Sequence, residues 1–235
     1  MWHVSIIVST QPVIAVTGLS FEARIARGNG ITVLCSSDER KLAALLDAAI
    51  AAGTSGIISF GAAGGLLPSL TAGTWIVAAA IVTERGRFPT DPRWSAKIAA
   101  ALPGATLADI AGVGRPVATA SDKQSLLRAT GAAAVDMESG VAAAAAAAHG
   151  LPFAACRIIL DAAWVDLPPA ALAGIRADGT PDSAAVLSSL MRRPDQFLAL
   201  LRLARDVHTV RTGLRHGRAL LGPTLGFAGL AAMTS

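Results

Sequence analysis

Three carboxylate side chains stand where an apolar, strand-like run of the sequence gives way to another element. Asp136 and Glu138 lie just before the alanine-rich stretch of residues 141–148, and Asp161 ends the run "PFAACRIILD". In open α/β sheets, ligand sites lie beyond the carboxyl ends of the strands, so Asp161 is a candidate general acid. A turn or capping aspartate is an equally good interpretation of Asp161 taken alone.

The pair Asp136 and Glu138 is harder to explain by capping. Backbone N–H groups and the helix dipole favour a carboxylate at the start of a helix, and capping is the simpler interpretation of one acid there. Capping then leaves the second carboxylate unexplained. We therefore treat Glu138 as a candidate ligand-binding side chain, with Asp136 beside it.

A glycine-rich stretch is the third candidate. The run "SFGAAGGLLPSL" places Gly61, Gly64 and Gly65 after a strand-like segment, where the absence of side chains lets the backbone approach a ligand closely. Many strand ends look alike, so this stretch gains weight only in combination with the acids.

The elements that must position these residues alternate between strand-like and helical. Apolar runs such as "ITVLC", "GIISF" and "TWIVAAAIV" are too continuous to leave one face wet, which predicts central strands covered on both sides. Helical segments separate these runs, and one of them ends at Gly53. The alternation predicts a single α/β domain over residues 1–235, and residues 194–235 form its last helix and tail.

Composition excludes several classes of protein. Hydrophobic residues make up 53% and charged residues 15%, which excludes a disordered chain. The four histidines and two cysteines show no metal-ligand spacing, so we expect no metal. No apolar run reaches the roughly twenty residues of a membrane-spanning helix, and the start lacks a basic leader, so a cytoplasmic location is expected. Residues 1–12 form either an extra strand or an ordered tail.

The order of these motifs resembles one enzyme family. A strand, "GAAGGL", a strand, "VDMES" at a helix start, and a strand ending in "RIILD" are similar in order to the nucleoside phosphorylase and nucleosidase superfamily. Its members cleave the N-glycosidic bond of purine or pyrimidine nucleosides. The resemblance implies a three-layer α/β/α sandwich with a central mixed, largely parallel sheet, and it implies a homodimer.

The resemblance also implies roles for individual residues. Glu138 would bind the ribose hydroxyls, Met137 would pack on the sugar, and Asp161 would protonate the departing purine. Glu22 lies near the position of the glutamate that activates water in the nucleosidases, although a first-turn helix glutamate is an equal alternative. The remaining substrate contacts would come from Gly61, Ala62, Ala63, Gly64 and Asp136.

The nucleophile stays open between water and inorganic phosphate, and no cofactor is implied. Purine phosphorylases of the trimeric type carry an arginine before the glycine loop and a serine within it, whereas this chain has Ser59 and Ala62 at the nearest positions. Arg24 and Arg87 are candidates for a replacement phosphate site, because a guanidinium group matches the geometry of a phosphate.

Further stretches resemble one branch of this superfamily, the hopanoid-associated phosphorylases. They are "GLSFEARIARG", "DAAWVDLPP" and "RRPDQFLALLRLA". That branch is thought to remove adenine from adenosylhopane, so this lipid-linked adenine nucleoside is the expected substrate. Two alternatives remain open: a methylthioadenosine or adenosylhomocysteine nucleosidase, and a catalytically silent protein that binds a nucleoside or a lipid.

The C-terminal tail is first basic and then apolar. Its arginines are Arg202, Arg205, Arg211, Arg215 and Arg218. Such a segment can make peripheral contact with the anionic inner face of a membrane, or it can be a solvated helix packed on its other side against the domain. Nucleic acid is not expected as a partner, because no aromatic residue stands among these arginines to stack on bases.

Overall fold

The apolar runs of the sequence form one eight-stranded sheet in a computed structural model, which describes residues 11–176 and 178–227. In chain order the strands are β1 (Val13–Thr17), β2 (Ile31–Cys35), β3 (Gly56–Gly65), β4 (Trp75–Thr83), β5 (Gly86–Pro89), β6 (Thr106–Gly112), β7 (Ala134–Asp136) and β8 (Phe153–Asp161). They follow the order β2-β1-β3-β7-β6-β4-β5, and β8 pairs with both β3 and β4. The prediction for residues 1–12 lies almost wholly outside the described residues.

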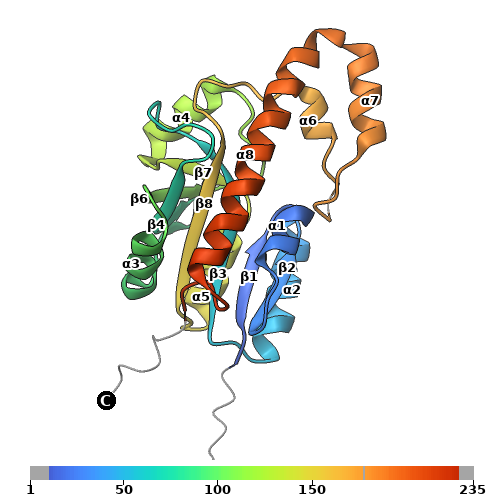
Figure 1. The fold of residues 1–235 in the computed structure, drawn as a ribbon. Helices are drawn as coiled ribbons and strands as arrows, with labels where there is room; N and C mark the ends of the chain where they lie inside the picture. Colours follow the sequence, from blue (N-terminus) through green and yellow to red (C-terminus); the bar gives the residue numbers. More distant parts are fainter. Residues whose placement is uncertain (1–10, 177, 228–235) are drawn as a thin grey trace, which may run out of the picture.

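Helices cover both faces of this sheet (Figure 1). They are α1 (Ser20–Ala26), α2 (Glu39–Ala51), α3 (Pro92–Ala101), α4 (Ala120–Thr130), α5 (Ser139–Ala148), α6 (Pro169–Ala173), α7 (Ser183–Arg192), the 3-10 turn η1 (Pro194–Gln196) and α8 (Phe197–Leu221). Buried side chains of α2 and α5 share one core cluster, and those of α1, α3 and α8 share another. This arrangement confirms the three-layer α/β/α sandwich with a mixed sheet.

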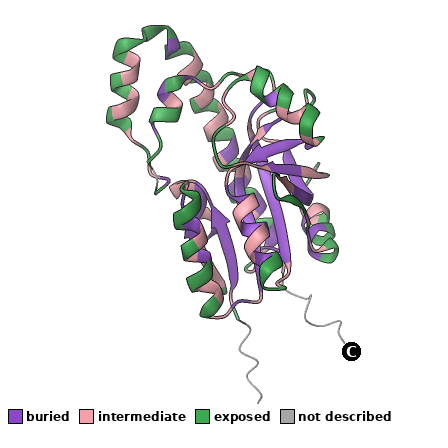
Figure 2. Cartoon of the chain, turned by 180° about the vertical axis from the view of Figure 1, so that it is seen from behind, coloured by how far each residue is buried: buried purple, intermediate pink, exposed green. Residues whose placement is uncertain are grey.

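Strand β1 shows why its first four residues are all apolar. Val13 and Ala15 belong to the core cluster under α1, α3 and α8, whereas Ile14 and Val16 belong to the cluster under α2 and α5. Successive side chains of a strand point to opposite faces, so a strand covered on both faces carries apolar side chains on both. Figure 2 shows the consequence, since the central strands are buried, whereas exposed residues lie on outer helix faces, in loops and in strands β5 and β6.

The glycine-rich end of β3 closes part of the sheet. β3 pairs in parallel with β8 as far as Gly64, with a register shift between Ala63 and Gly64, and Gly64 and Gly65 also pair with β7 in the antiparallel direction. Because β7 joins β6, β6 joins β4 and β4 joins β8, these five strands form a ring. The prediction that the glycines follow a strand was therefore wrong. They lie in its last five residues, and glycine permits the irregularity at which β3 pairs with both β7 and β8.

Helix α8 packs directly on the sheet, and its C-terminal end reaches the core (Figure 1). A Cβ at Gly217 would lie 2.5 Å from the ring of Trp75, so glycine is what permits this approach. Beyond the helix, Leu225 is buried, and Phe227 packs edge-on against Trp94 with ring centroids 4.7 Å apart. The described part of the tail is therefore a helix packed against the domain, which is one of the two arrangements expected from the sequence. No helix within residues 11–176 and 178–227 is long and apolar enough to cross a bilayer.

Candidate active site

Four carboxylate side chains line one cavity at the ends of β1, β3, β7 and β8. The cavity has a volume of about 260 Å³, and its acidic side chains are those of Glu22, Asp136, Glu138 and Asp161. Lysine, arginine and histidine side chains are absent from its lining among the described residues. The fold thus brings together acids from three distant segments of the chain. The cavity volume lies just below the lower end of the range for small-molecule sites, about 300 Å³.

Asp136 and Glu138 have different partners, although only Met137 lies between them. Oδ1 of Asp136 accepts a hydrogen bond from the backbone N–H of Ser139 at 2.8 Å, which caps the start of α5. Glu138 makes no side-chain capping bond, and its side chain is 7% exposed at the cavity. The capping interpretation therefore accounts for Asp136, and Glu138 is the carboxylate left for another task.

Arg157 lies in the middle of β8, fully buried behind these acids. Its Nη2 donates hydrogen bonds to Oε2 of Glu138 at 3.1 Å and to Oγ of Ser59 at 2.5 Å. Its Nε lies 2.8 Å from Oδ2 of Asp136 and forms an ion pair with it, although the N–H does not point at that oxygen. A Cβ at Gly61 would lie 2.7 Å from Nη1 of Arg157, so a side chain at this position would displace the guanidinium.

Glu22 of α1 accepts hydrogen bonds from three backbone N–H groups in two segments of the chain. Its Oε2 accepts hydrogen bonds from the N–H groups of Gly18 and Leu19 at 3.0 and 2.9 Å. Its Oε1 accepts one from the N–H of Ala62 in β3 at 2.8 Å. Glu22 is thus both a glutamate of the first helical turn and a wall of the cavity, so the two sequence interpretations of this residue are compatible.

Asp161, at the end of β8, is paired with a buried lysine. The Nζ of Lys123, in α4, lies 2.5 Å from Oδ2 of Asp161 and also donates to the backbone oxygens of Ala162 and Val165 at 2.9 and 2.7 Å. These three acceptors use the three N–H bonds of the ammonium group. Lys123 therefore fixes both the carboxyl group and the loop that follows it.

Burial dominates the protonation of three of these acids. It raises the pKa of Glu138 from 4.5 to about 8, against the opposing charge of Arg157. It also raises the pKa of Glu22, again against Arg157. Burial raises the pKa of Asp161 more than Lys123 lowers it. A general acid must hold its proton near neutral pH, and the raised pKa of Asp161 has the direction that this role needs.

The raised pKa of Glu138 predicts a pH dependence of stability. Between about pH 4.5 and pH 8 the folded chain keeps a proton on Glu138 that the unfolded chain has lost, so the free energy of unfolding falls as the pH rises through this window. Glu138→Gln keeps a neutral side chain of the same shape. We expect its melting temperature to decrease less than that of the wild type between pH 5 and pH 8, measured by calorimetry.

Glu84→Gln is the matched control, because Glu84 is exposed in the turn after β4. This variant should keep the wild-type pH dependence. Equal slopes for wild type and Glu138→Gln would contradict the assignment of a raised pKa to Glu138.

The structure separates the predicted site residues into two groups. Ala62, Ala63, Gly64 and Met137 line the cavity together with the four acids, whereas Gly61 lies behind it beside Arg157. The two phosphate candidates do not reach it. Arg24 lines a separate groove between α1 and α8, and Arg87 pairs with Asp109 at 2.8 Å on the exposed β5 edge.

Two residues of the site were missed from the sequence. Arg157 carried a signal, because a charged residue inside the continuous apolar run of β8 must be buried and therefore needs acidic partners. Lys123 carried none, since a lysine in a polar helix is ordinarily solvated. For a metal, the described residues contain no group of three histidine, cysteine, aspartate or glutamate side chains placed to hold one.

Comparison with known families decides the assignment. The sequence profile described as the phosphorylase superfamily matches residues 7–192. The chain belongs to the phosphorylase superfamily. This membership confirms the family and the enzyme class expected from the sequence, a nucleoside phosphorylase or nucleosidase. A comparison with curated protein sequences gives no match.

Solved structures share the fold of this phosphorylase superfamily member at low sequence identity. The methylthioadenosine/adenosylhomocysteine nucleosidase of Helicobacter pylori is 15% identical with a TM-score of 0.65, covering 92% of this chain and 98% of its own. A protein of Francisella philomiragia described as a putative nucleosidase of the same type is 14% identical with a TM-score of 0.62, covering 90% and 97%. Futalosine hydrolase of Helicobacter pylori is 17% identical with a TM-score of 0.57, covering 64% and 89%.

Proposed function

We propose that this enzyme hydrolyses the N-glycosidic bond between adenine and ribose in a nucleoside with an apolar 5′ substituent, with adenosylhopane as the candidate substrate. The observation that carries the proposal is the convergence of Glu138 and Asp161 on one cavity from the ends of β7 and β8. Cleavage builds positive charge on the sugar and negative charge on the departing base, so two separately placed carboxyl groups stabilise the transition state.

The two acids divide the reaction between them. As the C1′–N9 bond breaks, its electron pair leaves with adenine, and Asp161 donates a proton to the purine. Glu138 binds the ribose hydroxyls and is held in place by Arg157 at 3.1 Å. Water adds to C1′ and loses a proton, which Glu22 of the cavity wall accepts. The products are adenine and a ribosyl compound with a free anomeric hydroxyl group.

Water is favoured over phosphate by the charges around the cavity. Phosphate is bound in proteins by arginine, lysine or a cluster of backbone N–H groups. In the described residues the lining of this cavity supplies four acids and no basic side chain. The two cations behind the lining already have partners: Arg157 is bonded to Glu138 and Ser59 and paired with Asp136. Lys123 is bonded to Asp161 and to two backbone oxygens.

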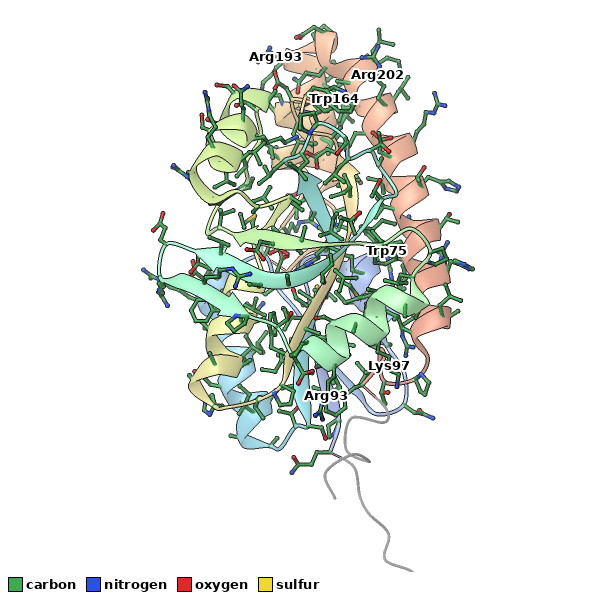
Figure 3. All side chains as sticks on the ribbon, turned by 90° about the vertical axis from the view of Figure 1, so that its left-hand side faces the viewer. Trp75, Arg93, Lys97, Trp164, Arg193 and Arg202 are labelled. Carbon is green, nitrogen blue, oxygen red and sulfur yellow. The ribbon has the colours of Figure 1, made fainter. Side chains whose placement is uncertain are left out.

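The size and wall of the cavity support an apolar substituent. A volume of about 260 Å³ leaves no room for a large lipid beside a nucleoside. Leu172 and Ile175 line the cavity and are still 38% and 47% exposed, so an apolar wall runs from the site to the surface. Trp164, which is 58% exposed, lies at the same end of the molecule as Arg193 and Arg202 (Figure 3). A lipid substituent would leave the cavity across the apolar side chains of Leu172, Ile175 and Trp164.

Small thioether nucleosides are the competing substrates. One similar structure is described as a Helicobacter pylori nucleosidase mutant with 5′-methylthioadenosine in the active site, at 15% identity, a TM-score of 0.58, and coverage of 88% of this chain and 98% of its own. The apolar wall at Leu172 and Ile175 favours the larger substituent in this chain.

The product of the reaction tests the proposal directly. The purified chain is incubated with adenosylhopane or with methylthioadenosine, with and without phosphate, and the sugar product is identified by mass. We expect adenine release from adenosylhopane without phosphate and a free ribosyl product. A phosphorylated ribose would contradict water as the nucleophile, and equal rates with methylthioadenosine would contradict the apolar preference. Ligand binding without adenine release would identify a silent binding protein.

A pair of variants tests the role of the apolar wall. Ile175→Ser places a hydroxyl on the wall and should lower kcat/KM for adenosylhopane by about tenfold, the effect of losing one buried apolar contact of this size, while sparing methylthioadenosine. Leu187→Ser is the control, because Leu187 is 59% exposed on α7 and does not line the cavity.

A homodimer and membrane contact through the basic helix α8 also remain proposals for this chain.

A further inference from the structure

A second hollow of this chain lies outside the catalytic cavity, in the groove between α1 and α8. Its volume is about 360 Å³, and it is lined by Phe21, Arg24, Ile25, Arg211, Arg215 and Arg218. We name it the arginine groove. It shares no lining residue with the acidic cavity, because Phe21 and Arg24 face α8 whereas Glu22 of the same helix faces the cavity.

The helical spacing explains how so many arginines meet. Arg211, Arg215 and Arg218 are separated by four and three residues, which places them on one face of α8. Arg24 joins them from the last turn of α1, and the two helices lie side by side in Figure 1. Four guanidinium groups therefore border one space.

Two of these arginines are held in place by the protein. Nε of Arg218 donates to the backbone oxygen of Ala26 at 3.1 Å, and its other nitrogens donate to the oxygens of Arg27, Gly222 and Pro223. The guanidinium of Arg211 lies 5.4 Å from the centroid of the Phe21 ring, within the range of a cation–π contact. The groove is thus built on fixed groups.

The remaining two arginines are exposed and lack an acidic partner. Arg24 and Arg215 form no ion pair with any carboxylate of the described residues, and no acidic side chain lines the groove. Like charges on neighbouring turns repel one another, so this cluster is stabilised when an anion enters it. Guanidinium groups bind phosphate through paired N–H bonds, and Phe21 and Ile25 add an apolar surface.

We propose that the arginine groove binds the phosphate group of an organic phosphate, at a site distinct from the catalytic cavity. The apolar surface of Phe21 and Ile25 would contact the organic part. A soluble phosphate ester and a phospholipid headgroup present the same chemistry, so the experiment must separate these two sources. The proposal does not depend on the reaction catalysed in the acidic cavity.

Binding of defined probes to the full chain tests the proposal. The soluble probe is phenyl phosphate, measured by calorimetric titration, and the lipid probes are phosphatidylcholine vesicles with and without phosphatidylglycerol, measured by flotation. The variant is Arg24→Gln with Arg215→Gln, since both residues are exposed and leave the contacts of Arg218 intact. The control is Arg202→Gln with Arg205→Gln, which removes the same charge from exposed positions of α8 outside the groove.

We expect at least one probe to bind the wild type and the control variant, with binding to Arg24→Gln/Arg215→Gln weaker by about tenfold or more, the effect of losing one charged hydrogen bond. Loss of phenyl phosphate binding would assign a soluble ester, and loss of vesicle binding alone would assign a headgroup. Equal weakening in both double variants, or no binding of any probe, would overturn the proposal. Since the readout is binding, a failure of this proposal is distinct from a failure of the enzyme to release adenine.

Discussion

Asp161→Asn is expected to reduce adenine release from adenosylhopane by about 10²- to 10⁴-fold, the usual contribution of a positioned general acid. Asparagine has no acidic proton to give to the departing purine. Its amide oxygen can still accept the hydrogen bond from Lys123, which lies 2.5 Å from Oδ2 in the wild type. The fold and the affinity for adenine should therefore change little. Single-turnover kinetics measures the rate of adenine release separately from ligand binding.

Asp166→Asn is the matched control for this variant. Asp166 is exposed in the same loop, and its Oδ1 accepts a hydrogen bond from the N–H of Ala120, which asparagine can also accept. It should keep near wild-type activity. If Asp161→Asn retained more than a tenth of the wild-type rate, Asp161 would not be the general acid.

Arg157→Met is expected to lower the free energy of unfolding by about 3–5 kcal/mol, the typical effect of removing one partner of a buried ion pair. Arg157 is fully buried, and its positive charge opposes the raised pKa values of both Glu22 and Glu138. Without it these carboxyl groups either stay charged in an apolar environment or take up protons. Urea denaturation followed by circular dichroism measures the change.

The pH dependence identifies the cause of this destabilisation. In Arg157→Met the acids bind protons more tightly in the folded chain than in the unfolded chain, so the loss should be larger at pH 8 than at pH 5. Arg87→Met is the control, since the Arg87–Asp109 pair has an arginine side chain 56% exposed, and such a pair contributes about 0–1 kcal/mol. A similar small loss in both variants would contradict the role of Arg157 as counter-charge.

Several elements follow from local sequence because local physics determines them. The first four residues of strand β1 are apolar, and α2 begins at the capping residue Asp38 and ends before Gly53, whose φ of 99° favours glycine. Strands β5 and β6 were not identified, because they lie towards one edge of the sheet and carry exposed residues, with Leu107 57% exposed. Their pairing with β4 depends on contacts distant in sequence.

The sequence by itself determined the α/β alternation, the family resemblance, and three acids at strand ends, because hydrophobic period, capping chemistry and motif order are local properties of the chain. Only the tertiary structure decided which charges meet. It placed Arg157 among Glu22, Asp136 and Glu138, and it paired Lys123 with Asp161. It also moved Arg24 away from the cavity into a separate groove. Burial and the distances between groups far apart in sequence set pKa values and ion pairs, and these arise only when the sheet closes.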